Sequence, residues 1–78
     1  MRPLITVTTD FGLDDSFVGI MKGVILNIEP EAHIIDITHN IDPQNIFQAS
    51  QTLNATYPWY PRKTIHIVVV DPGVGGPT

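Results

Sequence analysis

The most apolar stretch of the chain reads Thr64-Ile65-His66-Ile67-Val68-Val69-Val70. Its β-branched residues favour an extended strand. A near-continuous apolar strand is typical of a parallel sheet whose two faces are both covered by helices. Asp71-Pro72-Gly73 follows directly and indicates a turn at the carboxyl end of the strand. The stretch therefore predicts an α/β fold built on a parallel sheet.

Two other strands and a helix are predicted before this stretch. Residues 4–9 and residues 33–37 are short runs rich in β-branched residues. Between them a helix is expected to start near Asp14-Asp15-Ser16 and to continue through apolar residues at helical spacing. It must end at or before Glu29, because Pro30 follows. This part of the chain thus predicts a strand, a helix and a second strand.

A second helix is expected to begin at Asp42-Pro43, since an acid at the N-cap followed by proline is a typical helix start. Its predicted buried face consists of Ile46, Ala49, Leu53 and Tyr57. In the first helix, Gly19 and Gly23 lie four residues apart, and each costs about 1 kcal/mol relative to alanine. We expect a neighbouring backbone to pack closely against these two glycines as compensation.

The predicted order of elements is β-α-β-α-β, with right-handed crossovers. Three strands and two helices make up half of a doubly wound domain, and alone they would leave two open sheet edges. We therefore interpret residues 1–78 as an incomplete N-terminal portion of a three-layer domain with a mostly parallel sheet.

The composition narrows the function classes. Eight acids and four bases give a formal net charge of −4, and the bases are scattered, so we expect no nucleic-acid partner. No apolar run approaches 18 residues and no signal-peptide pattern is present, so no membrane association is expected. The absence of cysteine is compatible with the cytoplasm, which is the expected location.

Aspartates occur at the carboxyl ends of all three predicted strands. Asp10 follows the first strand, Asp36 lies near the end of the second, and Asp71 follows the third, while Asp15 opens the first helix. Ligands of open parallel sheets bind beyond these strand ends. Several carboxylates there would suit a cation, a ribose diol or Mg²⁺. The alternative is that these aspartates only form turns and caps.

Other candidate motifs are weaker. Gly73-Val74-Gly75-Gly76 is not a dinucleotide or phosphate-loop fingerprint, because a third glycine and a Gly-Lys-Ser/Thr sequence are missing. The three histidines include no pair four residues apart, so no metal site is expected. His33 and His66 lie within strands and are interpreted as structural. His39 lies in a loop at a strand end, where contact with the site and a structural role are equally open.

Four motifs, in this order, resemble those of one family. They are Thr9-Asp10-Phe11-Gly12, residues 15–23 (DSFVGIMKG), residues 35–39 (IDITH) and residues 69–75 (VVDPGVG). The chain resembles the S-adenosyl-L-methionine hydroxide adenosyltransferase family, the adenosine-forming hydrolases related to the fluorinating and chlorinating enzymes. The resemblance covers essentially the whole chain. It implies a longer protein with a C-terminal β-barrel domain, assembled as a homotrimer that binds substrate between the N-domain of one subunit and the C-domain of the next.

The resemblance also implies roles for individual residues. Asp10 matches a ribose-binding aspartate, and Asp15 matches an aspartate near the methionine end of the substrate. Phe11, next to Asp10, and His39, from its place at a strand end, are also expected to contact the substrate. Asp71 matches the first member of a catalytic Asp-Arg-His set that activates water. The family's arginine falls seven or eight residues later, where this sequence has Thr78 or ends, and no histidine here matches the third member.

The implied reaction is hydrolysis of S-adenosyl-L-methionine to adenosine and L-methionine, without metal or cofactor, and with no activity expected of residues 1–78 alone. The halogenating relatives carry tyrosine at the position of Asp71 and tryptophan near Gln44, which points away from halogenation. Two alternatives stay open at this point. One is a Mg²⁺-dependent phosphohydrolase that uses the same aspartates, and the other is a non-catalytic nucleoside-binding module.

Overall fold

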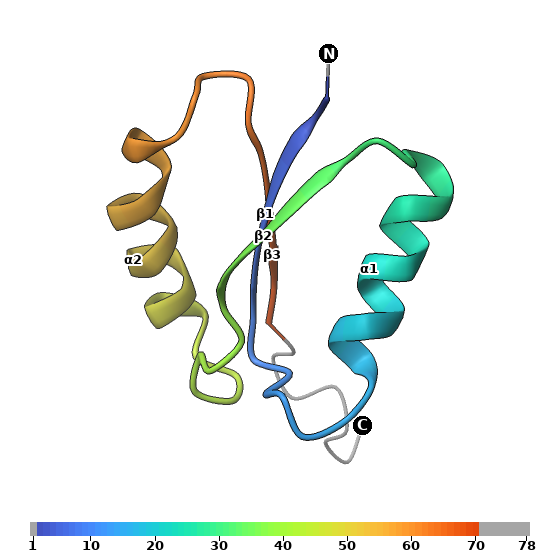
Figure 1. Cartoon of the computed structure of the whole chain (residues 1–78). Coiled ribbons are helices and arrows are strands. Elements are labelled where there is room, and N and C mark those ends of the chain that lie inside the picture. Colours follow the sequence, from blue (N-terminus) through green and yellow to red (C-terminus); the bar gives the residue numbers. More distant parts are fainter. Residues whose placement is uncertain (1, 71–78) are drawn as a thin grey trace.

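The structure is a computed structural model and describes residues 2–70. Its strands are β1 (Leu4–Thr9), β2 (His33–Thr38) and β3 (Ile65–Val69). Its helices are α1 (Phe17–Ile28), α2 (Ile46–Thr56) and a short 3₁₀ helix, η1 (Tyr57–Trp59). The strands are parallel in the order β2-β1-β3, and α1 and α2 lie on opposite faces of the sheet (Figure 1). The predicted α/β class and element order are confirmed.

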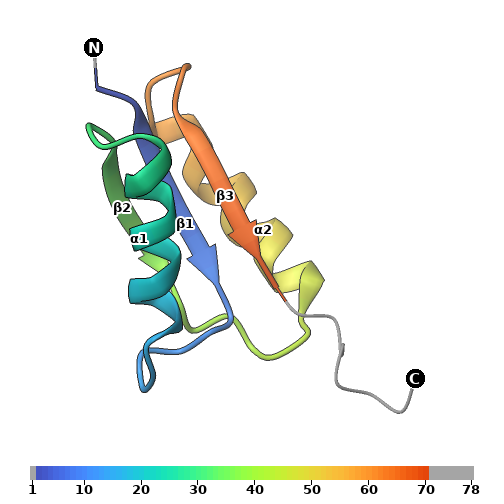
Figure 2. The ribbon, with the colours of Figure 1, turned by 90° about the vertical axis from the view of Figure 1, so that its right-hand side faces the viewer.

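The central strand, β1, is the most deeply buried element of residues 2–70. The turned view shows it between β2 and β3 (Figure 2). Ile5 and Val7 are buried, and so are the three threonines of the strand. Two of these threonines bond to histidines, because a buried hydroxyl needs a partner. Thr6 Oγ1 lies 2.7 Å from Nδ1 of His66 on β3, so His66 has the structural role expected for it.

The pairing of β1 with β2 contains one irregularity. Val7 pairs with Asp36 and Thr8 pairs with Thr38, so Ile37 is an extra residue on β2. Such a bulge bends a strand and changes where the following side chains point. The bulge lies between Asp36 and His39, and it therefore sets the relative position of these two residues at the carboxyl end of β2.

The expectation that both faces of β3 are covered is wrong for the described residues. Ile65 is 51% exposed and Val68 is 36% exposed. Strand β3 pairs with β1 along one edge, and nothing among residues 2–70 covers its outer side. Beside it, a cavity of about 320 Å³ lies between β3 and α2. The strand is apolar enough for a fully buried position, but this part of the chain places it at a sheet edge.

The predicted start of α2 at Asp42-Pro43 is also wrong. The helix begins at Ile46, and Asn45 is its N-cap, with Oδ1 accepting the main-chain N–H of Gln48 at 2.8 Å. The Gln48 side chain in turn accepts the N–H of Asp42 at 2.8 Å. This is not a capping box, in which the Gln48 side chain would accept the N–H of Asn45 itself. The Asn45 bond satisfies one donor of the first helical turn, and the Gln48 side chain ties the turn at Asp42 to the helix. Asp42 and Pro43 therefore form a turn before the helix.

The predicted buried face of α2 is half correct. Ala49 is 3% exposed and Leu53 is half-buried, but Ile46 and Tyr57 are exposed. Ile46 borders the open cavity beside β3, so little covers it. Tyr57 lies in η1, where the tighter turn changes the direction of its side chain.

Helix α1 buries a narrower face than its composition suggests. Val18 is buried and Ile25 is half-buried, whereas four large apolar residues remain more than half exposed: Phe17, Ile20, Val24 and Ile28. Gly19 and Gly23 have no atom within 4 Å of the position that a Cβ would take. The expected close packing against these glycines is therefore wrong within residues 2–70. Neither helix in this part of the chain is long and apolar enough to cross a membrane.

Candidate functional site

A cavity of about 320 Å³ opens at the carboxyl ends of the strands. Three segments contribute to its lining: the loop after β1, the start of α1 and the turn before α2. The residues that line it are Asp10, Phe11, Asp15, Phe17, Pro43 and Gln44. Three of the residues predicted from the sequence, Asp10, Phe11 and Asp15, thus share one cavity where ligands of open parallel sheets are expected.

Asp10 is held between two other segments. Its main-chain N–H donates to the carbonyl oxygen of Val69 on β3 at 3.3 Å. Its Oδ2 accepts the main-chain N–H of Gln44 at 3.4 Å. Two residues later, Gly12 adopts a left-handed φ of 73° and donates its N–H to the carbonyl oxygen of His39 at 2.7 Å. The loop that carries Asp10 is therefore attached to β3, to the turn before α2 and to the end of β2.

Asp15 and two aromatic rings form the other side of the cavity. Asp15 Oδ1 accepts the N–H of Phe17 at 3.0 Å, a local bond in the turn that leads into α1. The N-cap residue, Ser16, makes no side-chain capping bond. The rings of Phe11 and Phe17 lie 5.9 Å apart between centroids, at an interplanar angle of 57°. This tilted contact is a favourable aromatic geometry. The cavity therefore combines two carboxylates with an apolar aromatic wall.

His39 does not line this cavity. Its side chain is 3% exposed, and both ring nitrogens bond to protein atoms. Nδ1 lies 2.7 Å from Thr9 Oγ1, and Nε2 lies 2.7 Å from Asp36 Oδ1. Thr9 Oγ1 also accepts the main-chain N–H of Phe11 at 3.1 Å. His39 is therefore connected to the cavity only indirectly, by hydrogen bonds through the Thr9 hydroxyl to the backbone of Phe11.

Asp36 is engaged in an ion pair. Its Oδ2 lies 2.7 Å from Lys22 Nζ, and its Oδ1 accepts from His39. Partial burial acts to raise the pKa of the Asp36 carboxyl, but the hydrogen bonds from Lys22 and His39 and the positive charge of Lys22 outweigh it. The pKa of this carboxyl is therefore lowered from its ordinary value. Of the aspartates expected to converge, Asp10 and Asp15 do so and Asp36 does not, while Asp71 lies outside the described residues.

Residues 2–70 contain no group of three or more His, Cys, Asp or Glu side chains that could hold a metal ion. Within this range, the cavity presents the carboxylates of Asp10 and Asp15 and the apolar carbon of the aromatic residues, while the main-chain N–H of Gln44 is bonded to Asp10.

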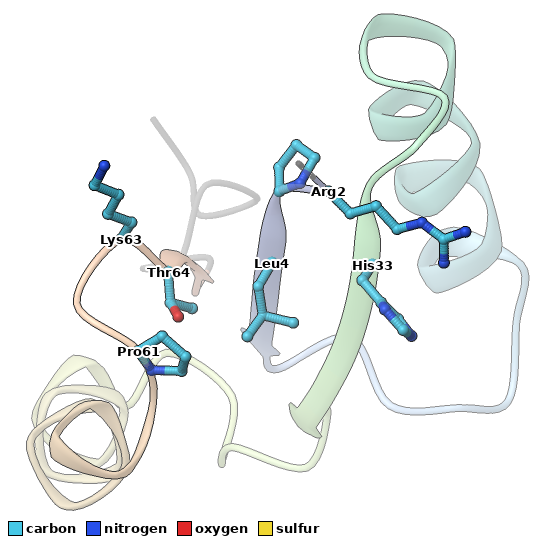
Figure 3. Close-up of a pocket in the computed structure, with 7 residues that line it drawn as sticks. Arg2, Leu4, His33, Pro61, Lys63 and Thr64 are labelled. Atoms are coloured by element: carbon cyan, nitrogen blue, oxygen red, sulfur yellow. The ribbon is translucent and has the colours of Figure 1, made fainter.

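A larger cavity, of about 530 Å³, lies at the opposite end of the strands (Figure 3). Its lining includes two cations, Arg2 and Lys63, as well as His33. The close-up shows the side chains of Arg2 and Lys63 pointing away from each other. Because the two cationic side chains do not point toward a common position, they do not form a binding site for an anion. The cavity at the carboxyl ends of the strands is therefore the better candidate for the functional site.

Comparison with known proteins identifies the family. Residues 5–78 match the model of the SAM hydroxide adenosyltransferase N-terminal domain. The chain belongs to this family. An (R)-S-adenosyl-L-methionine hydrolase from Methanocaldococcus jannaschii is 46% identical over 76 residues, and the one from Thermus thermophilus is 36% identical. A fluorinase from Nocardia brasiliensis is 27% identical.

The matches cover most of this chain but a minority of each family member. The alignment with the M. jannaschii hydrolase spans 92% of this chain and 28% of that protein, and the alignment with the T. thermophilus hydrolase spans 96% and 29%. Two crystal structures have the same fold. A conserved hypothetical protein from T. thermophilus superposes with a TM-score of 0.83 at 36% identity, covering 96% of this chain and 31% of the other. An uncharacterized conserved protein from Thermotoga maritima has a TM-score of 0.85 at 46% identity, covering 91% and 27%.

Sequence reasoning missed several members of the site. Pro43 and Gln44 were interpreted as part of a helix start, yet they line the cavity. Thr9 was interpreted as a strand residue and as the first residue of a family motif, but it was given no role in the site, yet its hydroxyl joins His39 to the Phe11 backbone. The signal available for Thr9 was its place at the end of the strand, directly before Asp10.

Proposed function

We propose that the full-length protein hydrolyses S-adenosyl-L-methionine to adenosine and L-methionine. The observation that carries the proposal is that Asp10 and Asp15 line one cavity at the carboxyl ends of the strands. These residues match the family positions for the ribose and for the methionine end of the substrate. The relatives at 36–46% identity named as S-adenosyl-L-methionine hydrolases support it as well.

The chemistry suits this cavity. Water oxygen attacks the 5′ carbon of the ribose, the bond from this carbon to sulfur breaks, and its electron pair goes to sulfur. Methionine leaves as a neutral thioether, and the water releases a proton. In-line attack requires a fixed ribose, and Asp10 is suited to accept hydrogen bonds from the diol because its own backbone is anchored to β3. Asp15 would face the ammonium group of the methionine portion.

Two further features fit the same reaction. The sulfonium loses its charge as the nucleophile adds, so a site with little water favours the step. The aromatic wall of Phe11 and Phe17 supplies apolar surface for such a site. Asp71 is proposed to orient the attacking water, together with an arginine and a histidine of the longer protein. Asp71 lies outside the described residues, so this role rests on the resemblance.

Hydrolysis is preferred to halogenation for two reasons. The relatives named as hydrolases are 36–46% identical, whereas those named as fluorinases are 24–27% identical. The resemblance also places tyrosine and tryptophan in the halogenating branch where this chain has Asp71 and Gln44. Gln44 lines the cavity beside Asp10.

The assembly is part of the proposal too. We infer that residues 1–78 form the first part of a substrate-binding N-domain, that a C-terminal β-barrel domain completes the protein, and that the protein works as a homotrimer in the cytoplasm without metal or cofactor. The support is the resemblance, together with the chain's span of about 28% of the M. jannaschii hydrolase.

The test is turnover of S-adenosyl-L-methionine by the full-length protein in ¹⁸O-labelled water with EDTA present. The expected products are adenosine and methionine in equal amounts, with ¹⁸O in the 5′ hydroxyl of adenosine. Absence of adenosine, or ¹⁸O found elsewhere, would contradict the proposal. Parallel reactions with added chloride or fluoride are the control, and the formation of a 5′-halogenated nucleoside in them would favour the halogenating alternative.

A further inference from the structure

We propose that His39 is a positioning residue that acts through Thr9 on the loop carrying Asp10 and Phe11, rather than by touching the substrate. This inference rests on the proposed function, because it concerns the geometry of the same cavity. Both ring nitrogens of His39 already bond to protein atoms, and its side chain is 3% exposed. No ring nitrogen is therefore left to face a ligand.

The hydrogen bonds form a continuous chain with one consistent direction. A carboxylate only accepts, so His39 Nε2 carries a proton and donates to Asp36. In the neutral ring Nδ1 accepts, and it accepts from the hydroxyl of Thr9. The same hydroxyl oxygen accepts the N–H of Phe11 at 3.1 Å. We call this chain, from Phe11 through Thr9 and His39 to Asp36, the relay.

The far end of the relay is fixed by α1. Lys22 Nζ lies 2.7 Å from Asp36 Oδ2, so the carboxylate is held by a cation from the helix as well as by the histidine. The carbonyl oxygen of His39 accepts the N–H of Gly12 at 2.7 Å. The N–H groups of Phe11 and Gly12, one on each side of the Phe11 Cα atom, are therefore both hydrogen-bonded.

The relay is in direct contact with the residues that line the cavity. Thr9 is fully buried at the end of β1, directly before Asp10, and the backbone N–H that its hydroxyl fixes is that of Phe11. Displacing reacting groups by as little as about 1 Å can lower a rate roughly a hundredfold. Loss of the Thr9 hydroxyl is therefore expected to disturb the cavity without removing any group that touches the substrate.

The test uses the full-length protein with Thr9→Val, which keeps the side-chain volume and removes the hydroxyl. Thr9→Ser restores the hydroxyl. Thr8→Val is the matched control, because Thr8 is similarly buried on the same strand and lies outside the relay. We expect Thr9→Val to weaken adenosine binding and to lower kcat/KM by about tenfold or more. Thr9→Ser and Thr8→Val should stay close to wild type per folded molecule.

Two outcomes would overturn the proposal. One is unchanged adenosine affinity in folded Thr9→Val. The other is equal loss in Thr9→Val and Thr8→Val, which would indicate general destabilisation. If Thr9→Val does not fold, Asp36→Ala serves instead, because the Asp36 side chain is 43% exposed and its removal leaves the strand packed. It should weaken adenosine binding in the same direction, and unchanged binding would overturn the proposal.

A second measurement separates this proposal from the proposed function. Amide exchange at Phe11 should be faster in Thr9→Val than in Thr8→Val whether or not the protein is a hydrolase. If the wild type neither binds adenosine nor cleaves S-adenosyl-L-methionine, the proposed function fails. Faster exchange of the Phe11 amide in Thr9→Val would then still support the proposal that the relay positions the loop. Unchanged exchange would overturn that proposal.

Discussion

The main-chain N–H of Gln44 donates to Oδ2 of Asp10 at 3.4 Å, across 34 residues of sequence. Gln44 reaches this position with a left-handed φ of 66°, which is uncommon for a residue other than glycine. The turn before α2 is thus tied to the carboxylate that we assign to the ribose. A strained backbone that is held by its surroundings often marks a functional site.

Asp10→Ala in the full-length protein should weaken adenosine binding. A hydrogen bond to a charged group contributes about 1.5–3 kcal/mol, which corresponds to roughly ten- to a hundredfold in affinity. Calorimetric titration with adenosine measures the change. Asp14→Ala is the control, since Asp14 is an exposed acid of the same loop that does not line the cavity. Equal affinity in both variants would remove Asp10 from the site.

Asp71→Asn should lower turnover while the fold and most of the substrate affinity remain. If Asp71 orients water, loss of its charge is expected to cost about a hundred- to a thousandfold in kcat. Adenosine release from S-adenosyl-L-methionine, with EDTA present, measures this. Asparagine forms turns well, so turnover within about threefold of wild type would favour a turn-forming role for Asp71 over the loss expected of a catalytic group.

The ion pair of Asp36 should make the free energy of unfolding depend on pH in the acid range. Because its pKa is lowered in the folded protein, its contribution is present at neutral pH and is lost as the pH falls below the ordinary value of 3.8 through the lowered one. Asp36→Asn should therefore destabilise the protein at pH 7 by about 1 kcal/mol or less, since the side chain is 43% exposed and the pair is screened. Urea unfolding should show this difference narrowing towards pH 3. A difference that stays constant with pH would contradict the assignment.

At Gln44 the glycine variant should be more stable than the valine variant, which is the reverse of the order expected at an ordinary turn residue. Gln44→Gly relieves the left-handed conformation, whereas Gln44→Val places a β-branched residue there, so we expect the valine variant to be less stable by about 1–2 kcal/mol. Arg62 is the control, an exposed turn residue without a positive φ. There, glycine should be the less stable substitution. Thermal unfolding of the four variants measures both differences, and the same order at both positions would contradict the strain argument.

The 78-residue chain alone should self-associate. Strand β3 leaves Ile65 and Val68 exposed at a sheet edge, and α1 exposes Ile20, Val24 and Ile28. Exposed apolar edges are templates for pairing between chains. Sedimentation is expected to show oligomers or aggregates. A monomer that melts cooperatively in calorimetry would show that this edge is tolerated.

The elements and the cavity aspartates could be predicted because each depends on local sequence. β-branched runs specify the strands, and a carboxylate directly after a strand must lie at the end of the sheet, as Asp10 does. The start of α2 was mispredicted because Asp42-Pro43 and Asn45 with Gln48 are competing signals. Which of them prevails depends on the contact of Gln44 with Asp10.

The relay could not be predicted because it depends on register. The extra residue at Ile37 shifts the pairing of β2 with β1, and it is this shift that brings His39 beside Thr9. Nothing in the composition of either strand indicates a bulge there. The sequence did predict that the apolar third strand would lie at an open sheet edge, but it did not predict that Ile65 and Val68 would also be exposed, since that depends on the tertiary structure.

The central place of β1 has a consequence for how the chain folds as it is made. The first strand to be synthesised is the one that both later strands need, and Thr6 lies 60 residues before its partner His66. At about 5–20 residues per second of synthesis, roughly 3–12 seconds separate the two. During that interval β2 can pair with one edge of β1 while the other edge, which β3 later occupies, stays open to solvent and to other chains. The nascent protein is therefore most exposed to mispairing before β3 emerges.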